Sequence, residues 1–256
     1  EVVKNHYTAR NSELASAAPD VPDLYTRTDG AAFDYEGQLW IENASNMDGT
    51  LIQFMQDGSQ KALSLQNSGD PYCIHTPAEL CIDMYNRQRK WMLACRAGTA
   101  VVLFNDGGIV LESFDDQLTV RTELHDQDGN AIIPEFYYTI AQSPNGDIWV
   151  GSSMGPIIIP HEVNFEQEDI CRRLRITMPD GTYLLETERI NSFAFTQDKI
   201  CIGTQMNGVY ILNEDATEVL AHYTSDNTPM PSNTILSLAY DELNNMLYIG
   251  TGGGLV

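Results

Sequence analysis

Short apolar stretches separated by turn-forming residues are the dominant pattern along this chain. One stretch recurs five times, and in each copy an aromatic residue or a cysteine is followed by an apolar residue; an apolar residue also precedes it in every copy except the second, where Lys90 precedes Trp91. The copies are about fifty residues apart, which is a typical period for arrays of β-units. The central residues of the copies are Trp40, Trp91, Trp149, Cys201 and Tyr248. All three tryptophans of the chain therefore occupy one position of the repeat.

Each copy has an apolar stretch before it and another after it. The earlier stretch carries a small residue, and turn formers such as Pro144 to Asp147 separate it from the central stretch. This spacing predicts a β-hairpin. A third strand is expected at Leu51 to Phe54, Val101 to Phe104, Ile157 to Ile159, Val209 to Leu212 and Leu255 to Val256. A fourth strand fills the period, with its best copies at Val219 to Thr224 and Val2 to Thr8, both containing His-Tyr-Thr.

Four antiparallel strands per unit of about fifty residues predict an all-β fold, a β-propeller. Small residues suit first strands that crowd around an axis, and the aromatic residues suit the wider space between neighbouring blades. Helical periodicity is almost absent, which disfavours an α/β fold. We interpret residues 1–256 as one propeller region with about five visible blades.

The number of blades in the intact molecule stays open. The chain begins on a fourth strand and ends at the start of a third. Either His6 to Thr8 completes the last blade and closes the ring, or the chain is a segment of a larger propeller or multi-domain protein. The abrupt ending at Gly252 to Val256 favours truncation at the C-terminus.

Composition narrows the classes of function. The chain has 256 residues with 14 Lys and Arg against 36 Asp and Glu, a formal charge of −22. Such a surface repels nucleic acids, so we expect no nucleic-acid partner. No run approaches the roughly 18 apolar residues of a membrane-spanning helix. The five cysteines are irregularly spaced and indicate neither a disulfide framework nor a zinc site. We expect no metal and no cofactor.

Two stretches, Gly146 to Ser152 and Leu247 to Leu255, resemble the two-component-regulator propeller repeat, whose consensus is D-x-x-G-x-L-W-I-G-T-x-x-G-L. Within this family the chain is most similar to the propeller of the type IX secretion attachment complex. Departures occur at Ile41 to Asn43 and Leu93 to Cys95, which lack Gly-Thr, and at Cys201, which replaces an aromatic residue. The stretches similar to the type IX propeller are Val102 to Gly108, Phe114 to Gln117, Gly181 to Glu186, Gly208 to Leu212 and Asn227 to Ile235.

No motif assembles a catalytic site, so we predict that the chain is not an enzyme. Arg96, Arg121 and Arg189 are too scattered in the sequence to indicate the arginine cluster that a sialidase needs. Asp126 to Asn130 resembles a calcium loop only superficially, and a solvated turn is the favoured interpretation. Arg172 to Arg175 is interpreted as a solvated outer strand.

Propellers usually bind at one mouth of the central channel, where blade links and the loops after each second strand converge. We predict contacts to a saccharide or a peptide from planar and amide side chains in these loops. These candidate binding residues are Tyr25, Arg96, Met154, Gln205 and Asn233. The alternative is that they are ordinary loop residues.

The resemblance implies a non-enzymatic binding or docking module in the periplasm or on the cell surface, with a protein or saccharide partner. A second hypothesis is the ligand-sensing propeller of a hybrid two-component system that recognises a polysaccharide fragment. A third is a glycan-active hydrolase or lyase, because a fold alone does not define an activity.

Overall fold

The computed structural model describes residues 5–22, 24–46, 49–65, 77–94, 99–107 and 116–256. Every regular element in this part of the chain is a β-strand, and none of it forms a helix suited to crossing a membrane. The strands belong to two compact units, an N-terminal unit (residues 1–122) and a C-terminal unit (residues 123–256).

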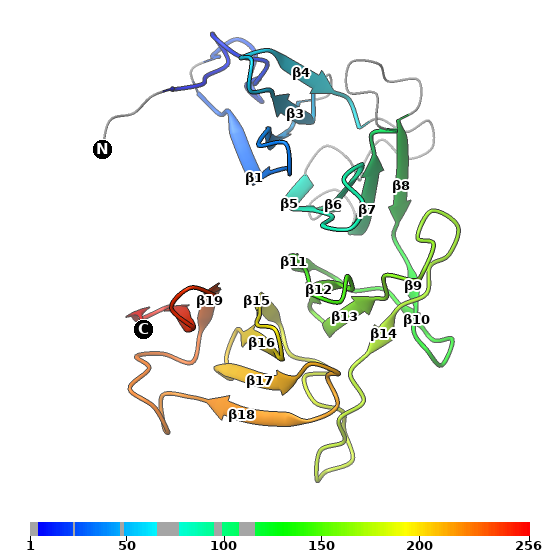
Figure 1. Ribbon diagram of the computed structural model, residues 1–256, viewed down its shortest axis with the longest axis vertical. Coiled ribbons are helices and arrows are strands. Elements are labelled where there is room, and N and C mark those ends of the chain that lie inside the picture. Colours follow the sequence, from blue (N-terminus) through cyan, green and yellow to red (C-terminus); the bar gives the residue numbers. More distant parts are fainter. Residues whose placement is uncertain (1–4, 23, 47–48, 66–76, 95–98, 108–115) are drawn as a thin grey trace. The chain divides into compact units, whose positions relative to one another are not determined.

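The N-terminal unit contains two antiparallel sheets of four strands, and in each sheet the strands follow their order in the chain (Figure 1). The first sheet consists of β1 (Arg27–Phe33), β2 (Leu39–Ala44), β3 (Leu51–Phe54) and β4 (Gln60–Leu63). The second consists of β5 (Pro77–Ile82), β6 (Arg89–Ala94), β7 (Ala100–Asn105) and β8 (Gln117–Arg121). The first strands of the two sheets, β1 and β5, pack against each other.

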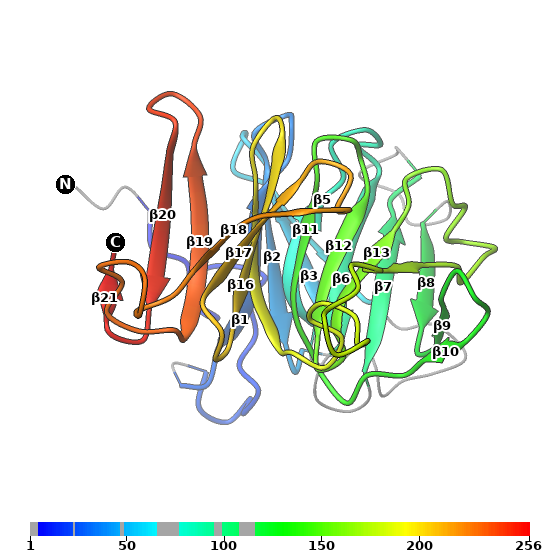
Figure 2. The same ribbon diagram turned by 90° about the horizontal axis from the view of Figure 1, so that it is seen from below.

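The C-terminal unit contains three further antiparallel sheets and a short hairpin formed by β9 (Leu124–His125) and β10 (Ala131–Ile132). The first sheet of this unit consists of β11 (Tyr137–Gln142), β12 (Ile148–Ser152), β13 (Gly155–Ile159) and β14 (Arg172–Arg173). The second consists of β15 (Ile190–Phe195), β16 (Lys199–Thr204), β17 (Val209–Asn213) and β18 (Val219–Tyr223). The third consists of β19 (Ile235–Asp241), β20 (Met246–Thr251) and β21 (Gly254–Leu255). Figure 2 shows β19 and β20 as a long hairpin, with β21 short beside β20. The last sheet thus has three strands in the described chain.

These sheets confirm the predicted fold class, an all-β propeller of antiparallel blades. In the C-terminal unit, β15 contacts β11 on one side and β19 on the other, so first strands line up from blade to blade. The predicted third strand at Leu51 to Phe54 coincides with β3, and Val219 to Tyr223 forms the predicted fourth strand, β18. The basic Arg172–Arg173 pair forms β14, an outer strand as expected.

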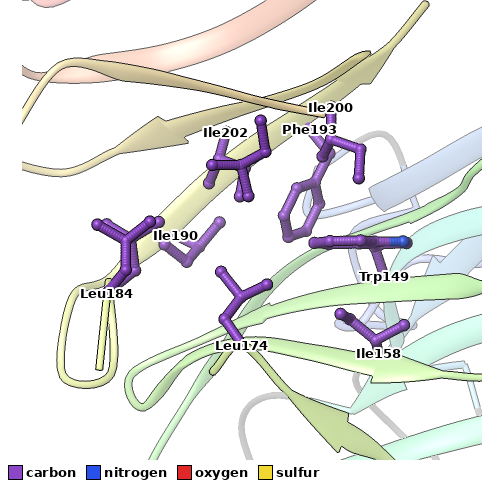
Figure 3. Close-up of a cluster of buried hydrophobic side chains, with 10 residues drawn as sticks. Trp149, Ile158, Leu174, Leu184, Ile190, Phe193, Ile200 and Ile202 are labelled. Atoms are coloured by element: carbon purple, nitrogen blue, oxygen red, sulfur yellow. The ribbon is translucent and has the colours of Figure 1, made fainter. Parts of the chain in front are cut away.

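Trp149 shows what the repeated aromatic residue does. It opposes the small residue Ala141 within its own sheet. Its indole packs edge-on against Phe193, with ring centroids 5.6 Å apart (Figure 3), and against Phe195, at 5.9 Å. Phe193 and Phe195 lie on β15 of the next blade, so the indole fills the space between two sheets. Burying an aromatic side chain of this size stabilises a core by several kcal/mol, about 3–5 by truncation.

Tyr248 departs from this pattern. Trp40, Trp91, Trp149 and Cys201 are all at most 3 % exposed, whereas Tyr248 is 38 % exposed. Among the described strands of the C-terminal unit, β19–β21 is the last sheet in chain order, and Tyr248 is not buried against another sheet there.

The glycine two residues after the central residue of a repeat lies where neighbouring blades approach most closely. A Cβ atom at Gly151 would lie 2.7 Å from the Ile190 carbonyl oxygen, and one at Gly203 would lie 2.6 Å from Cγ2 of Ile235. Ile190 and Ile235 begin the first strand of the following blade and are fully buried. The glycine of the repeat is therefore a packing requirement.

The described part of the fourth strand predicted at Val2 to Thr8 is not a strand, and Val2 to Lys4 lie outside the described residues. Residues 5–8 are outside any strand, and the segment packs on the first blade instead. The Tyr7 ring lies 4.6 Å from the Phe54 ring, and Leu14 is buried against Ile52 and Phe54. The repeated His-Tyr-Thr motif instead leads into a turn, because Asn11 caps the Thr8 backbone as Asn227 caps that of Thr224.

Candidate binding face

The turns after the second strands are held by a repeated hydroxyl group. Ser152, Thr204 and Thr251 each donate a hydrogen bond to the carbonyl oxygen of the glycine that closes the turn, at 2.7, 2.8 and 2.8 Å. Each hydroxyl also accepts a backbone N–H from inside the turn, at 2.9–3.1 Å. Together with the preceding glycine, this explains the Gly-Ser and Gly-Thr pairs of the repeat.

Each first strand carries a bulge beside these turns. The register shifts between Tyr137 and Thr139, between Ile190 and Ser192, and between Ile235 and Ser237. The residues inside these shifts are Tyr138, Asn191 and Leu236. A bulge leaves its extra residue out of the regular pairing and redirects its side chain, and bulges are common next to binding sites.

Tyr138 and Asn191 meet at Arg189. The Arg189 guanidinium lies 3.8 Å from the centre of the Tyr138 ring, and its Nε donates to the Asn191 side-chain oxygen at 2.8 Å. Asn191 in turn donates to Oε1 of Gln205 at 2.9 Å and to the Ile235 carbonyl oxygen at 2.7 Å. We call Tyr138, Arg189, Asn191 and Gln205 the Arg189 cluster.

Arg189 is exposed, and no carboxylate in the described chain forms an ion pair with it. Apolar side chains accompany the cluster on the same turns and bulges: Phe136 is 43 % exposed, Leu236 59 % and Met206 71 %. An unpaired guanidinium on an aromatic ring, two amides and exposed apolar groups can together hold a planar, acidic ligand.

Of the five predicted binding residues, Gln205 belongs to the Arg189 cluster. Asn233 lies in the adjoining blade link, where its carbonyl oxygen accepts from Gly208 N at 3.0 Å and its side chain accepts from Ser225 N at 2.7 Å. Tyr25 belongs to the N-terminal unit, is 66 % exposed and has a left-handed φ of 64°. Arg96 lies outside the described residues.

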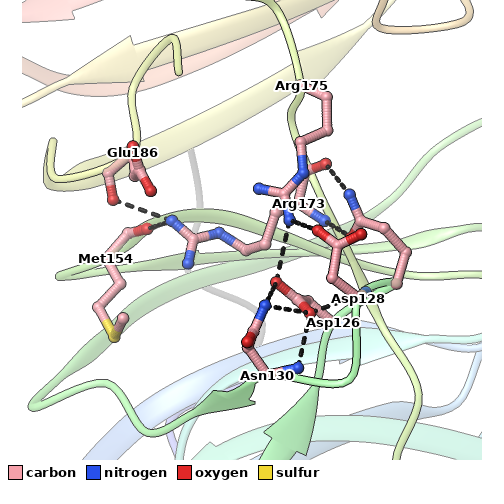
Figure 4. Close-up of polar contacts among 8 residues, drawn as sticks. Asp126, Asp128, Asn130, Met154, Arg173, Arg175 and Glu186 are labelled. Carbon is pink, nitrogen blue, oxygen red and sulfur yellow. Dashed lines mark hydrogen bonds and ion pairs between the residues drawn. The ribbon is translucent and has the colours of Figure 1, made fainter. Parts of the chain in front are cut away.

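Met154 lies in the turn between β12 and β13. Its carbonyl oxygen accepts a hydrogen bond from Arg173, whose guanidinium also donates to the Glu186 carbonyl oxygen at 2.9 Å (Figure 4). Figure 4 shows the thioether directed away from this guanidinium. The turn is held against the residue that precedes β11, because Ser153 N donates a hydrogen bond to the Phe136 carbonyl oxygen at 2.9 Å. The binding role of all five predicted residues stays a prediction.

The loop at Asp126 to Asn130 holds a guanidinium. Asp126 Oδ1 accepts from the backbone N–H groups of Asp128 and Asn130, both at 2.9 Å, while Arg175 pairs with Asp126 at 3.0 Å and with Asp128 (Figure 4). The hydrogen bonds from Asn130, Asp128 and Arg175 hold the pKa of the Asp126 carboxyl below its usual range, outweighing desolvation. A fixed positive charge therefore lies where a calcium loop would hold its ion.

Asp147, His161 and Glu162 are the group in the described residues whose ligand atoms lie close enough together for a metal, within 4.8 Å of one another. Asp147 is already engaged, because Arg172 lies 2.6 Å from its Oδ2 and His161 N lies 3.0 Å from its Oδ1. Asp147 and Arg172 border a cavity of about 240 Å³ together with Trp149, Glu214 and Asp215. The paired charges make this group a structural anchor.

Sequence reasoning missed Tyr138 and Asn191 and considered Arg189 only for a different site. A bulge has no local signature in this chain, and Tyr138 is about fifty residues from Arg189 and Asn191 along the sequence. The usable signal is the repeat itself. When the first strands of the three blades are aligned, Tyr138, Asn191 and Leu236 occupy the same position, the one at which the register shifts.

The blades and their alignment define a β-propeller. No protein-family model matches the chain, and no curated protein matches it. Among solved structures the chain is similar to PorZ, an essential bacterial surface component of the type IX secretion system of Porphyromonas gingivalis. The similarity to PorZ has a TM-score of 0.86 at 25 % identity over 98 % of this chain. The matched region spans 34 % of PorZ, so this chain covers about a third of that protein's length.

Two further structures share the fold. One is the extracellular domain of a one-component system from B. thetaiotaomicron, with a TM-score of 0.60 and 15 % identity over 90 % of this chain and 29 % of that one. The other is virginiamycin B lyase from Staphylococcus aureus, with a TM-score of 0.59 and 11 % identity over 91 % of this chain and 66 % of the enzyme. At these identities the likeness concerns the fold alone.

Proposed function

We propose that this chain is a non-enzymatic propeller module that acts outside the cytoplasm and docks an acidic saccharide or peptide on the Arg189 cluster. The similarity to PorZ at a TM-score of 0.86 is the observation that carries the proposal, because it combines 25 % identity with coverage of nearly the whole chain. The location of PorZ on the bacterial surface supports an extracytoplasmic role here.

The side chains of the cluster fit this role. Arg189 supplies an exposed positive charge, and the ring of Tyr138 beneath it supplies a flat apolar surface. Asn191 and Gln205 add amide groups with both donor and acceptor capacity. A guanidinium recognises a carboxylate through paired hydrogen bonds, and a tyrosine ring packs against a sugar or peptide plane.

Catalysis has less support in the described residues. The carboxylates near arginine, Asp126, Asp128 and Asp147, are paired with Arg175 or Arg172 and are not poised for proton transfer. The Arg189 cluster contains no nucleophile beside a general base, which acyl or glycosyl transfer would need. A binding role follows from what the cluster does contain.

The test is titration calorimetry with acidic and neutral oligosaccharides and acidic peptides. We expect an acidic ligand to bind, and Arg189→Gln and Tyr138→Ala each to weaken it by about tenfold, the equivalent of about 1.4 kcal/mol. Arg87 and Tyr35 in the N-terminal unit form another arginine–tyrosine contact, at 5.4 Å. Arg87→Gln and Tyr35→Ala are therefore matched controls and should leave the affinity unchanged.

If Arg87→Gln and Tyr35→Ala lowered the affinity for the acidic ligand as much as Arg189→Gln and Tyr138→Ala do, the Arg189 cluster would be refuted as the binding site. Product formation from any saccharide in the panel would refute the non-enzymatic role. A protein ligand that depends on Arg189 would favour docking within a secretion complex, whereas a free oligosaccharide alone would favour a sensor.

A further inference from the structure

Glu42 occupies a position at which blades of the C-terminal unit carry glycine. It follows Trp40 by two residues, as Gly151 follows Trp149, and the register is equivalent because Trp40 opposes Ala32 and Trp149 opposes Ala141. At Gly151 and Gly203 even a methyl group would overlap the next blade. In the N-terminal unit a complete glutamate side chain extends into this space.

The Glu42 carboxylate is fully buried and has no partner among the described residues. The residue is 0 % exposed, and neither carboxylate oxygen accepts a hydrogen bond from that part of the chain. It lies against the β1 bulge, because a Cβ atom at Gly30 would overlap Glu42 Oε2 and lie 2.9 Å from the Leu80 backbone nitrogen. The carboxylate is therefore inserted among β1, β2 and β5, all within one unit.

The charged groups that act on Glu42 are both negative. Asp29 lies in the β1 bulge and Glu79 in the β5 bulge, where its φ is 63°. Burial raises the Glu42 pKa well above its usual value, and the charges of Glu79 and Asp29 raise it further. Arg27 is directed to Asp29, at 3.6 Å, so it does not compensate Glu42.

A buried carboxylate without hydrogen bonds is strongly unfavourable in its charged form, so it either takes up a proton or is neutralised by a bound cation. Three carboxylates on three neighbouring strands form an oxygen-only donor set, which suits hard cations such as Ca²⁺. Asp29 and Glu79 are exposed at the surface of this junction, so their side chains can turn towards an ion held by Glu42.

We propose that Glu42, assisted by Asp29 and Glu79, binds a hard divalent cation at the junction of the first two blades. The ion would link β1, β2 and β5, where blades of the C-terminal unit rely on the close approach of a glycine. This site is independent of the Arg189 cluster and of the proposed function.

The test uses the whole chain, freed of metal with EDTA and then titrated with CaCl₂. Calorimetry and thermal unfolding should show saturable Ca²⁺ binding and a rise in Tm with ion concentration. Glu42→Gln should weaken Ca²⁺ binding by at least about tenfold, and Glu79→Gln should weaken it less. Glu218→Gln, which removes an equal charge from an exposed residue of the other unit, should have no effect.

Glu42→Gln should also raise Tm in EDTA, because it removes an unpaired buried charge. This gain shows that the variant is folded and separates lost binding from misfolding. If Glu42→Gln does not fold, Glu79→Gln and Asp29→Asn provide the same comparison. Absence of saturable binding, or unchanged binding in Glu42→Gln, would overturn the proposal. Stabilisation by acid but not by Ca²⁺ would also overturn it, because a proton alone would then neutralise Glu42.

Discussion

At the scale of single residues, Glu42 makes stability depend on pH. Its pKa is raised in the folded state, so the folded protein holds a proton that the unfolded chain releases above the usual value of 4.5. The contribution of Glu42 is therefore complete below that pH and is lost as the pH rises towards the folded-state pKa.

We predict that, in EDTA, the free energy of unfolding falls more steeply with rising pH from 4.5 to 7 in the native chain than in Glu42→Gln. A tenfold difference in proton affinity between the folded and unfolded states is worth about 1.4 kcal/mol. Urea denaturation at several pH values measures both slopes. The comparison is needed because the charge of −22 also disfavours folding at higher pH. Parallel slopes would contradict the assignment.

Two buried cysteines should be unreactive. Burial raises the pKa of Cys171 to about 12 and that of Cys201 to about 11. At pH 8 roughly one thiol in a thousand or fewer is then the reactive thiolate. We predict that iodoacetamide labels neither residue in the native protein and labels both in urea, with peptide mass spectrometry giving each site separately. Rapid native labelling of Cys201 would show that its blade opens.

At the scale of strands and blades, the glycine contact is the feature most open to test. We predict that Gly203→Ala destabilises the protein by about 1–3 kcal/mol, because its methyl group would press on Ile235 of the next blade. Gly252→Ala is a matched control, since its Cβ would lie no nearer than 3.6 Å to any atom, and should change stability by about 0.5 kcal/mol or less. Denaturant unfolding of both variants gives the comparison, and equal losses would refute the contact.

The strands could be predicted because their signals are local and repeated. Trp40, Trp91 and Trp149 each mark a second strand, and the turn formers between strands fix the hairpins. Residues 5–8 show the limit, since a strand sequence needs a neighbouring strand to pair with, and the described chain supplies none there. The missing Gly-Thr at Ile41 to Asn43 is visible in the sequence, but its consequence depends on tertiary contacts with Gly30 and Leu80.

The candidate site was predictable only in part. Gln205 could be proposed from the sequence because turns after second strands are natural contact points, and its binding role stays a prediction. Tyr138 and Asn191 were not, because a bulge breaks the two-residue alternation on which strand prediction depends. The pairing of Arg189 with Tyr138 is a tertiary contact between two blades and has no counterpart in the linear sequence.

At the scale of the whole molecule, the charge of −22 limits the partners. Most of the surface repels polyanions, and groups such as Arg189 offer only local attraction. We predict that fluorescently labelled duplex DNA shows no change in anisotropy with added protein at low or physiological salt. Binding that weakens steeply with salt would instead indicate a basic surface that the charge distribution does not suggest.

The hydroxyl groups of Ser152, Thr204 and Thr251 have a consequence for how recognition can change. Each hydroxyl and its closing glycine fix the path of a turn through main-chain atoms, so the side chains at the tip contribute little to the shape. The side chains at the tips of these turns can therefore be substituted without a change in the main-chain path, and such substitutions can alter which ligand is bound.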